Sequence, residues 1–282
     1  MINHLIVIIL IIIIIYLFFK FYIKTKYPFW TLQPAFHIYD LLYWIYSPGI
    51  IDQNVPIYNK YVNSENILTY NIDKMSESLK NISWKFVKNN YFDSNIDYLI
   101  DKKTFFDFFK ELDCNSYLSL YYINDDYYEN NLISVITTRP FNLTIRNKEI
   151  KTFYGDFFCI KKDYRNKNIA QEVLQTHIYH HAYNHKDRII GFMTRQTSKL
   201  KSIVPVLSVK SKYFQINSTD LIKSSENINI LKITEKTLNI FTDFIFKNKE
   251  SYDLFGTVPN ENLLLLINNK VYLIYVIIER TL

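Results

Sequence analysis

The sequence predicts a fold that combines helices and strands, α/β (α+β). A mixed sheet flanked by helices follows an N-terminal transmembrane helix. Two observations lead to this prediction. Residues 5–23 are apolar almost throughout, and residues 151–194 form a strand-like, a helix-like and a second strand-like run. A strand, a crossover helix and another strand make a parallel pair, whereas the hairpin-like runs before them indicate antiparallel neighbours.

Composition narrows the classes of protein to consider. The 282 residues are 49% hydrophobic and 17% aromatic, which is enough for a sizeable core. The net charge is +6, but the lysines are scattered and form no dense block, so nucleic-acid binding is not indicated. The two cysteines, Cys114 and Cys159, make neither a disulfide framework nor a metal-ligand pattern, and a reducing compartment fits best.

The apolar run at 5–23 has the features of an uncleaved membrane anchor. As a helix it would span about 28 Å, close to the hydrocarbon thickness of a bilayer. No Lys or Arg precedes it, whereas Lys20, Lys24 and Lys26 lie at or beyond its end, so the positive-inside rule places the C-terminal body in the cytosol. We expect a single-pass membrane protein with a cytosolic body; a buried core helix is the alternative.

The remaining elements follow from periodicity and turn residues. Prolines within 28–60 indicate an extended segment that wraps a domain. Helices are expected at 75–89, 103–112, 168–184 and 235–246. Strands are expected at 116–123, 131–138, 143–146, 151–160, 189–194, 228–233, 263–267 and 271–278, with hairpin turns at 147–148 and 268–269.

The loop at 161–170, KKDYRNKNIA, is the strongest functional signal of the chain. It ends a strand-like run and opens a helix-like run. The first N–H groups of a helix lack internal partners, and the helix dipole adds partial positive charge there. Arg165 and Lys167 would add full charges. The loop therefore predicts an anion site, with a plain basic loop as the alternative.

This loop resembles a known motif. Its form Arg165-x-x-Asn168-x-Ala170 is similar to the pyrophosphate loop of the GNAT acyltransferase superfamily, usually Gln/Arg-x-x-Gly-x-Gly/Ala, which grips the phosphates of an acyl-CoA. Four stretches also resemble, in order, the N-terminal half of the N-myristoyltransferase family, a GNAT member. They are FWTLQP at 29–34, NYFD at 90–93, DFFCIKK at 156–162 leading into YRNKNIA at 164–170, and MT at 193–194.

The resemblance implies roles for individual residues. The backbone N–H groups of Phe157 and Phe158 would form an oxyanion hole for the thioester carbonyl, and Thr194 would lie near the acceptor amine. With Asp156, these are the residues expected at the catalytic centre. The residues expected at the cofactor are Phe29, Trp30, Phe157, Phe158, Cys159, Ile160, Arg165, Asn166, Lys167, Asn168, Ile169 and Ala170.

Three departures from the family pattern affect the expected chemistry. Asp156 replaces an Asn beside the oxyanion hole, where a carboxylate would repel the developing charge or act as a base. Asn168 replaces an Arg, which weakens the expected hold on phosphate. The family's catalytic base is its C-terminal carboxylate, delivered by a second GNAT-like half. Residues 228–282 resemble only the opening of that half, so Leu282 is not assigned this role.

Histidines on the helix at 168–184 allow two interpretations. His177, His181 and His185 repeat every four residues and could ligate a metal. No carboxylate or cysteine completes the set, so we expect an exposed polar face and no metal. Cys159 has no His and Asp around it and is expected in the core.

We therefore expect an anchor at 1–23, a linker and wrapping segment at 24–60, a GNAT-like acyl-CoA-binding domain at 61–215 and a truncated second half at 216–282. The expected function is membrane-anchored N-acyl transfer, without a covalent enzyme intermediate. The donor would be myristoyl-CoA or acetyl-CoA, and the acceptor an amine of a protein N-terminus or a small molecule. The alternative is a non-catalytic membrane protein that keeps the fold for binding or assembly.

Overall fold

The computed structural model describes residues 2–45, 50–52, 54, 56–91, 101–110, 114–123, 129–145, 148–184, 189–193, 202–205, 229–232, 239–240, 243, 247, 254–257, 263–268 and 270–276. Contacts divide the chain into two units. The first contains Met1–Gln53 and Arg195–Phe214, and the second contains Asn54–Thr194 and Gln215–Leu282.

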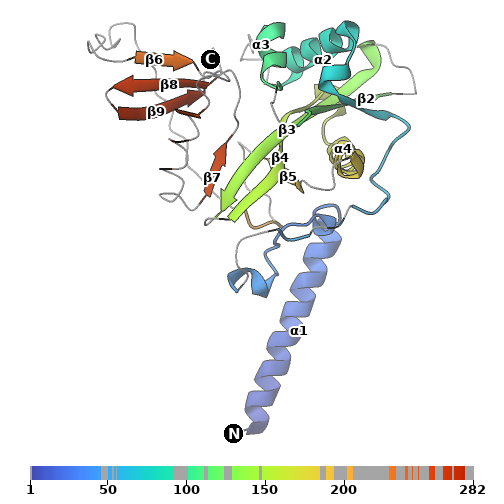
Figure 1. Ribbon diagram of the computed structural model, residues 1–282. Coiled ribbons are helices and arrows are strands. Elements are labelled where there is room, and N and C mark those ends of the chain that lie inside the picture. Colours follow the sequence, from blue (N-terminus) through green and yellow to red (C-terminus); the bar gives the residue numbers. More distant parts are fainter. Residues whose placement is uncertain are drawn as a thin grey trace, which may run out of the picture. The chain divides into compact units, whose positions relative to one another are not determined.

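The first unit begins with a long helix, α1 (Ile2–Lys26), shown in blue in Figure 1. Within the described residues, its part His4–Lys26 is the one helix that is long and apolar enough to cross a membrane. All side chains from Leu5 to Ile15 are exposed, which argues against a buried core helix. Two short 3-10 helices follow, η1 (Trp30–Leu32) and η2 (Leu41–Trp44).

A small antiparallel contact closes the first unit on itself. The N–H of Ile38 donates to the carbonyl of Ser202 at 3.2 Å, and the N–H of Val204 donates to the carbonyl of Phe36 at 2.8 Å. His37 and Ile203 form the bridge between these two bonds. Residues from both ends of the unit's sequence are thereby held together.

The second unit is built on a mixed sheet of six strands. Their order is β1-β2-β3-β4-β5, with β7 beside β3. β4 and β5 are parallel, and the other neighbours are antiparallel, which confirms the predicted mixed sheet. The strands are β1 (Ile67–Asn71), β2 (Tyr117–Tyr122), β3 (Leu132–Ile145), β4 (Lys148–Ile160), β5 (Ile189–Met193) and β7 (Leu254–Thr257).

Three further strands form a separate antiparallel sheet in the order β6-β8-β9. They are β6 (Asn229–Lys232), β8 (Leu263–Asn268) and β9 (Lys270–Val276), close to the strands expected there. β1 and β7 were not expected. The helix expected at 235–246 lies almost wholly outside the described residues.

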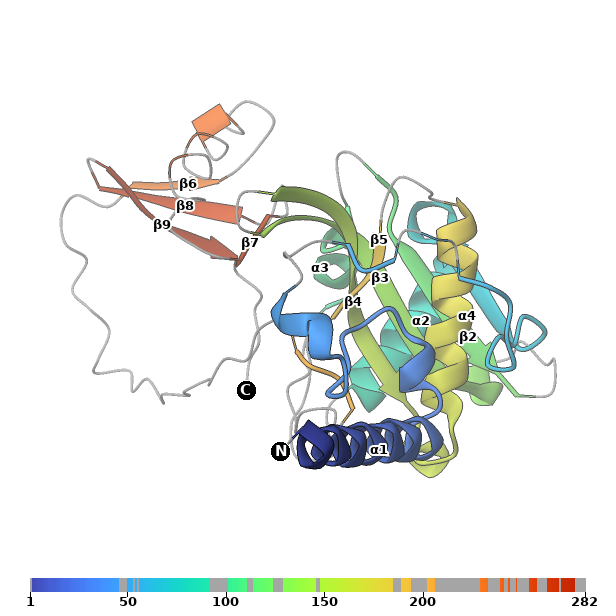
Figure 2. The same cartoon turned by 90° about the horizontal axis from the view of Figure 1, so that it is seen from below.

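Helices cover both faces of the larger sheet (Figures 1 and 2). α2 (Glu77–Asn90) and α3 (Lys102–Asp107) lie on one face, and α4 (Ile169–Asn184) lies on the other. The Ser76 hydroxyl caps α2, and the Asp101 carboxylate caps α3. Three 3-10 turns, η3 (Ile72–Lys74), η4 (Glu129–Asn131) and η5 (Lys162–Tyr164), connect the elements. α2 and α4 match their predicted ranges, whereas α3 ends at Asp107, before the expected residue 112.

The side chains of β2 alternate between the two faces of the sheet, as the pleat requires. Leu118, Leu120 and Tyr122 join the main hydrophobic core beneath α2 and α3. Ser119 and Tyr121 make hydrogen bonds to side chains of α4. The main core is aromatic, and Phe157 contacts the rings of Tyr91, Phe105, Phe108 and Phe109.

β3 is one strand where the sequence predicted two, at 131–138 and 143–146. Pro140 pairs with Phe153 of β4. On the other side of β3, the pairing with β2 ends at Thr138 and that with β7 begins at Asn142. Proline has no N–H, so it is tolerated where a strand is locally an edge. The connection after β3 is also one residue earlier than predicted, because Lys148 already pairs with Ile145.

Candidate functional site

A β-bulge interrupts β4 at Phe157 and Phe158. The register of the β3–β4 pairing shifts here, so that these two residues lie opposite the single residue Ile136. Phe157 has a φ of 43°, in the left-handed region that costs a bulky residue roughly 1–3 kcal/mol. Strained backbone of this kind concentrates at functional sites. The bulge coincides with the two residues predicted to form an oxyanion hole.

The carboxylate of Asp156 lies at one of the predicted oxyanion-hole donors. The N–H of Phe157 donates to Asp156 Oδ1 at 2.9 Å. The Thr137 hydroxyl donates to the carbonyl oxygen of Asp156 at 2.8 Å, which fixes the residue on the β3 side. A carboxylate at that N–H competes with any oxyanion that would bind there.

The described pairing of β4 with β5 stops just before the bulge. Gly155 pairs with Met193, the last described residue of β5. Within the described ranges, β4 has no strand partner on this side from Asp156 onward. Thr194, the residue predicted near the acceptor amine, comes next in the chain and lies outside the described residues.

Two asparagines shape the loop between β4 and α4. Asn166 and Asn168 have φ angles of 63° and 62°. Asparagine is one of the few residues besides glycine that enter this region readily. Asn168 stands where the GNAT pattern has glycine, and its φ gives the physical reason for glycine at that position. Backbone that alternates between left- and right-handed conformations turns its N–H groups to one side and forms a concave anion-binding nest.

Arg165 holds this loop in place. Its Nε donates to the carbonyl of Ile160 at 3.1 Å, and a terminal guanidinium nitrogen donates to the carbonyl of Asn90 at 3.3 Å. Because Asn90 ends α2, the positive charge also lies at the negative end of that helix dipole. The sequence did not predict this positioning role. Direct contact of Arg165 with a phosphate stays a prediction.

The loop otherwise presents its cations and amides to solvent. Lys162, Asn166, Lys167 and Asn168 are exposed. The Nζ of Lys167 lies 5.0 Å from the centre of the Tyr164 ring. The helix that follows begins with a buried Ile169 and a half-buried Ala170. An exposed, cationic helix N-terminus of this form is chemically suited to a phosphate.

Cys159 and Ile160, both predicted at the cofactor, lie between the bulge and the loop. Cys159 is buried in the core beneath α2, as the sequence predicted. Burial raises the pKa of its thiol to about 12, so it is not a thiolate near neutral pH. Ile160 is half-buried and offers its carbonyl to Arg165.

Phe29 and Trp30, the other residues predicted at a cofactor, belong to the first unit. Phe29 precedes η1 and Trp30 begins it. The Phe29 side chain is buried, and its ring meets that of Trp30 edge to face at 5.0 Å. Their contact with CoA stays a prediction.

The buried face of α4 is partly polar, which corrects the expectation of an exposed histidine face. His177 and His181 are 1% and 0% exposed. The two ring nitrogens of His177 lie 2.6 Å from Ser119 Oγ and 3.0 Å from Thr138 Oγ1. Because the sheet presents hydroxyls beneath the helix, the imidazole is buried with partners. His185 lies outside the described residues, within which no His, Cys, Asp or Glu side chains group as metal ligands would.

These hydroxyls belong to a hydroxyl–imidazole network that sequence reasoning missed. His180 lies 2.9 Å from Ser64 Oγ and 3.1 Å from Thr69 Oγ1, which in turn lies 2.7 Å from Ser119 Oγ. Burial, and secondarily the nearby His180, lowers the pKa of His177 to about 3. The network joins residues up to 116 positions apart in the sequence, so no local pattern could reveal it.

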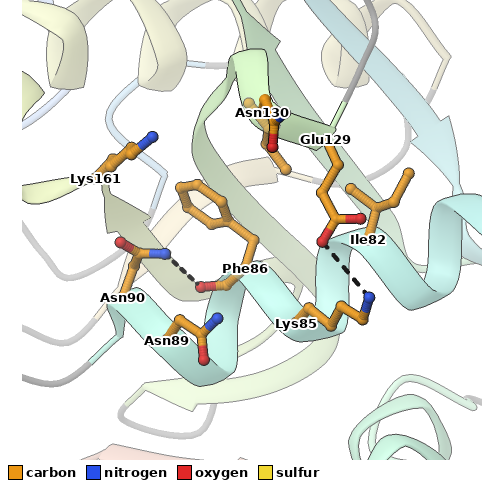
Figure 3. Close-up of a pocket in the computed structure, with 9 residues that line it drawn as sticks. Ile82, Lys85, Phe86, Asn89, Asn90, Glu129, Asn130 and Lys161 are labelled. Atoms are coloured by element: carbon orange, nitrogen blue, oxygen red, sulfur yellow. Dashed lines mark hydrogen bonds and ion pairs between the residues drawn. The ribbon is translucent and has the colours of Figure 1, made fainter.

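A pocket of about 180 Å³ lies beside the start of the loop, between α2 and the beginning of β3 (Figure 3). Lys161 lines it, and Lys85 and Glu129 point toward one another across 3.6 Å. Asn90 Nδ2 donates to the Phe86 carbonyl at 2.9 Å. This volume is below the roughly 300–1,000 Å³ of sites for drug-sized ligands, and we assign no ligand to the pocket.

Comparison with known proteins gives a clear result for structure alone. No family model and no curated protein matches the sequence. Solved structures of N-myristoyltransferase from Saccharomyces cerevisiae do match. One with bound myristoyl-CoA has 12% identity and a TM-score of 0.54, covering 83% of this chain and 60% of that one. One with myristoyl-CoA and inhibitors has 15% identity and a TM-score of 0.58, covering 82% and 57%. A third, with myristoyl-CoA, has 13% identity and a TM-score of 0.56, covering 83% and 57%.

The chain therefore shares the mixed α/β fold of these structures, and it contains a bulged strand, a loop and a helix in that order. More particularly, the chain has an N-myristoyltransferase-like fold. It spans less than two thirds of the length of the yeast chains.

Proposed function

We propose that this protein is a membrane-anchored N-acyltransferase that moves an acyl group from an acyl-CoA to an amine. The donor is myristoyl-CoA or acetyl-CoA, and the acceptor is a protein N-terminus or a small molecule. The observation that carries the proposal is the loop between β4 and α4. Its left-handed Asn166 and Asn168, its exposed Lys162 and Lys167 and the N-terminus of α4 lie together after a bulged strand.

In this proposal the loop binds the pyrophosphate of CoA. Phosphate oxygens accept hydrogen bonds from backbone N–H groups of the loop, and the lysines add charge. The thioester then lies along β4 toward the bulge. The amine attacks the thioester carbonyl, the C–S bond breaks, and CoA leaves as the thiol while the amine loses a proton. No covalent enzyme intermediate forms.

The bulge supplies the proposed oxyanion hole. Backbone donors stabilise a tetrahedral intermediate when they are fixed in advance where negative charge develops, and losing one costs roughly 3–4 kcal/mol. Asp156 must release the N–H of Phe157 for this donor to act, since its carboxylate accepts that hydrogen bond at 2.9 Å. Alternatively, the released carboxylate takes the proton from the attacking amine.

The anchor is α1, with the body in the cytosol. The support is its length, its apolar composition and the lysines at its C-terminal end. A tethered enzyme would work beside lipid-derived donors and membrane-bound acceptors.

Calorimetric titration of the full-length protein in lipid nanodiscs tests the proposal, with empty nanodiscs as the control. The ligands are a non-hydrolysable myristoyl-CoA analogue, acetyl-CoA and free CoA. Saturable binding of all three supports the CoA site. Tighter binding of the long chain selects myristoyl transfer, because each buried methylene contributes about 0.8 kcal/mol. Binding of none of the three contradicts the proposal.

A second candidate function is favoured by one observation. The carboxylate of Asp156 already occupies the N–H of Phe157, where an active transferase needs a free donor. A non-catalytic membrane protein that keeps the fold for binding or assembly would tolerate this contact. Such a protein would show no acyl transfer to any amine even where CoA binds.

A further inference from the structure

We propose that residues 36–45, which we term the collar, insert into the membrane interface alongside α1. This inference rests on the proposed membrane anchor and adds a second, non-helical contact with lipid. It assigns an interaction surface to the part of the chain after the anchor. The partner is the boundary between the headgroups and acyl chains of the bilayer.

The collar lies along the helix well before its C-terminal end. The Tyr16 hydroxyl donates to the carbonyl oxygen of Tyr39 at 3.1 Å. Lys20 Nζ lies 5.9 Å from the centre of the Tyr16 ring and 5.4 Å from that of Tyr39. Tyr16 precedes Lys26, the last residue of α1, by ten positions, which is about 15 Å along a helix. The collar therefore folds back about 15 Å from the end of α1.

Bilayer thickness then determines the depth of the collar. The apolar run before Tyr16, from Leu5 to Ile15, is about 16 Å of helix, roughly half of the hydrocarbon thickness. The longer stretch from Ile2 to Phe19 covers about 27 Å, close to the full hydrocarbon thickness. A helix that crosses the bilayer with this stretch places the charged Lys20 near the headgroup boundary and Tyr16 about one turn inside it. Whatever contacts Tyr16 then lies at the same depth, and that contact is the collar.

The surface of the collar suits lipid. Its outward side chains include Ile38, Leu41 and Ile45, which are 44%, 67% and 79% exposed. Lys20, whose Nζ lies 5.4 Å from the centre of the Tyr39 ring, places a positive charge beside the collar, and Lys24 and Lys26 follow in the last turn of α1. Apolar side chains next to lysines match the interface of a bilayer that carries anionic headgroups.

Backbone polar groups of the collar have hydrogen-bond partners, as a poorly hydrated site requires, because an unpaired polar group there costs several kcal/mol. The N–H groups of His37, Ile38, Asp40 and Tyr43 all have acceptors, at 2.7, 3.2, 2.9 and 3.1 Å. The carbonyls of Phe36 and Tyr39 both accept hydrogen bonds. The Asp40 carboxylate that accepts the hydrogen bond from His37 N–H also lies 3.3 Å from His37 Nδ1.

Site-directed spin labelling tests the proposal. The full-length protein, with Cys114 replaced by Ser and the buried Cys159 retained, is placed in vesicles of phosphatidylcholine with a minor share of phosphatidylserine. Nitroxides are attached to Leu41→Cys and Ile45→Cys in separate samples. The control is Ile57→Cys, an 84% exposed isoleucine outside the collar. Ile11→Cys, within α1, reports on the anchor itself.

The readout compares collisions with oxygen, which concentrates in lipid, and with a water-soluble nickel chelate. We expect the labels at Leu41, Ile45 and Ile11 to favour oxygen, and the label at Ile57 to favour the chelate. If Ile11 lies in lipid while Leu41 and Ile45 lie in water, or are shielded from both reagents by protein, the collar proposal is overturned and the anchor stands. If Ile11 lies in water, the anchor fails and the collar fails with it.

Discussion

Arg165 and Asn90 join two elements that the sequence separates by 75 residues. The guanidinium donates to the Asn90 carbonyl at 3.3 Å, so the loop before α4 is fixed to the end of α2. The same side chain reaches back to Ile160 at 3.1 Å. The shape of the proposed phosphate loop therefore depends on an arginine that need not contact phosphate.

Arg165→Ala should destabilise the fold. It removes two hydrogen bonds from a charged donor to part-buried carbonyls, and we expect the free energy of unfolding to fall by about 2 kcal/mol or more. Denaturant unfolding of the full-length protein, followed by tryptophan fluorescence, measures this. Lys167→Ala is the matched control in the same loop and should change stability by no more than about 0.5 kcal/mol. Equal effects of the two substitutions would contradict the positioning role.

Glycine and alanine substitutions of Asn168 test whether this position requires a residue that tolerates a left-handed backbone. Its φ of 62° suits glycine, whereas a Cβ without a local hydrogen bond is costly there. Asn168→Gly should leave both stability and CoA binding close to those of the wild type. Asn168→Ala should lower the free energy of unfolding by about 1 kcal/mol and weaken CoA binding. Binding that survives unchanged in Asn168→Ala would show that the loop conformation does not matter to the ligand.

Asp156→Asn distinguishes two roles for the carboxylate. If the carboxylate only competes for the Phe157 N–H, removing its charge should raise the rate of acyl transfer, by as much as roughly 10²-fold if the donor becomes fully available. If Asp156 is the base, the same variant should lose most activity, by about 10²–10⁴-fold. Single-turnover acyl transfer to a peptide with an N-terminal glycine measures the rate. A rate equal to that of the wild type contradicts both roles.

His177 should make stability depend on pH. In the unfolded chain it takes up a proton near its ordinary pKa of about 6.5, whereas burial holds its pKa near 3 in the folded protein. Between these values the unfolded state binds more protons, so the free energy of unfolding should decrease as the pH falls. The slope approaches about 1.4 kcal/mol per pH unit for one histidine.

His177→Gln provides the comparison for this prediction. Glutamine cannot take up that proton, so unfolding midpoints measured just below about pH 6.5, the ordinary histidine pKa, should fall less steeply in the variant than in the wild type. The half-buried His180, whose pKa is also lowered by burial, adds to the slope in both proteins. Parallel slopes would mean that His177 is not buried as a neutral group.

Some of this structure was predictable from local pattern. The strand and the helix within 148–184 follow from periodicity and from the residues that start a helix, and the basic loop lies between them as predicted. Hydrogen bonds between residues far apart in the sequence were not predictable. Arg165 contacts Asn90, and His177 contacts Ser119 and Thr138, only after the sheet has formed.

Two sequence predictions failed for physical reasons: the strand β1 was missed, and the histidines of α4 were expected to be exposed. β1 has a half-buried pattern after its first residue and no alternation strong enough to mark a strand. On α4, the histidines were expected to face solvent because most polar side chains do. Here Thr69, Ser119 and Thr138, from three different strands, form the polar hydrogen-bonding side of the helix–sheet interface.

The central claim is that the loop between β4 and α4 binds the phosphates of CoA. The most direct measurement is calorimetric titration of free CoA into Lys162→Ala/Lys167→Ala, both exposed in the loop, beside Lys148→Ala/Lys151→Ala, both exposed at the other end of β4. The two variants lose equal charge. We predict at least about a tenfold weaker affinity in the loop variant, equivalent to about 1.4 kcal/mol, and near wild-type affinity in the control. Equal affinities in the two variants would contradict the claim.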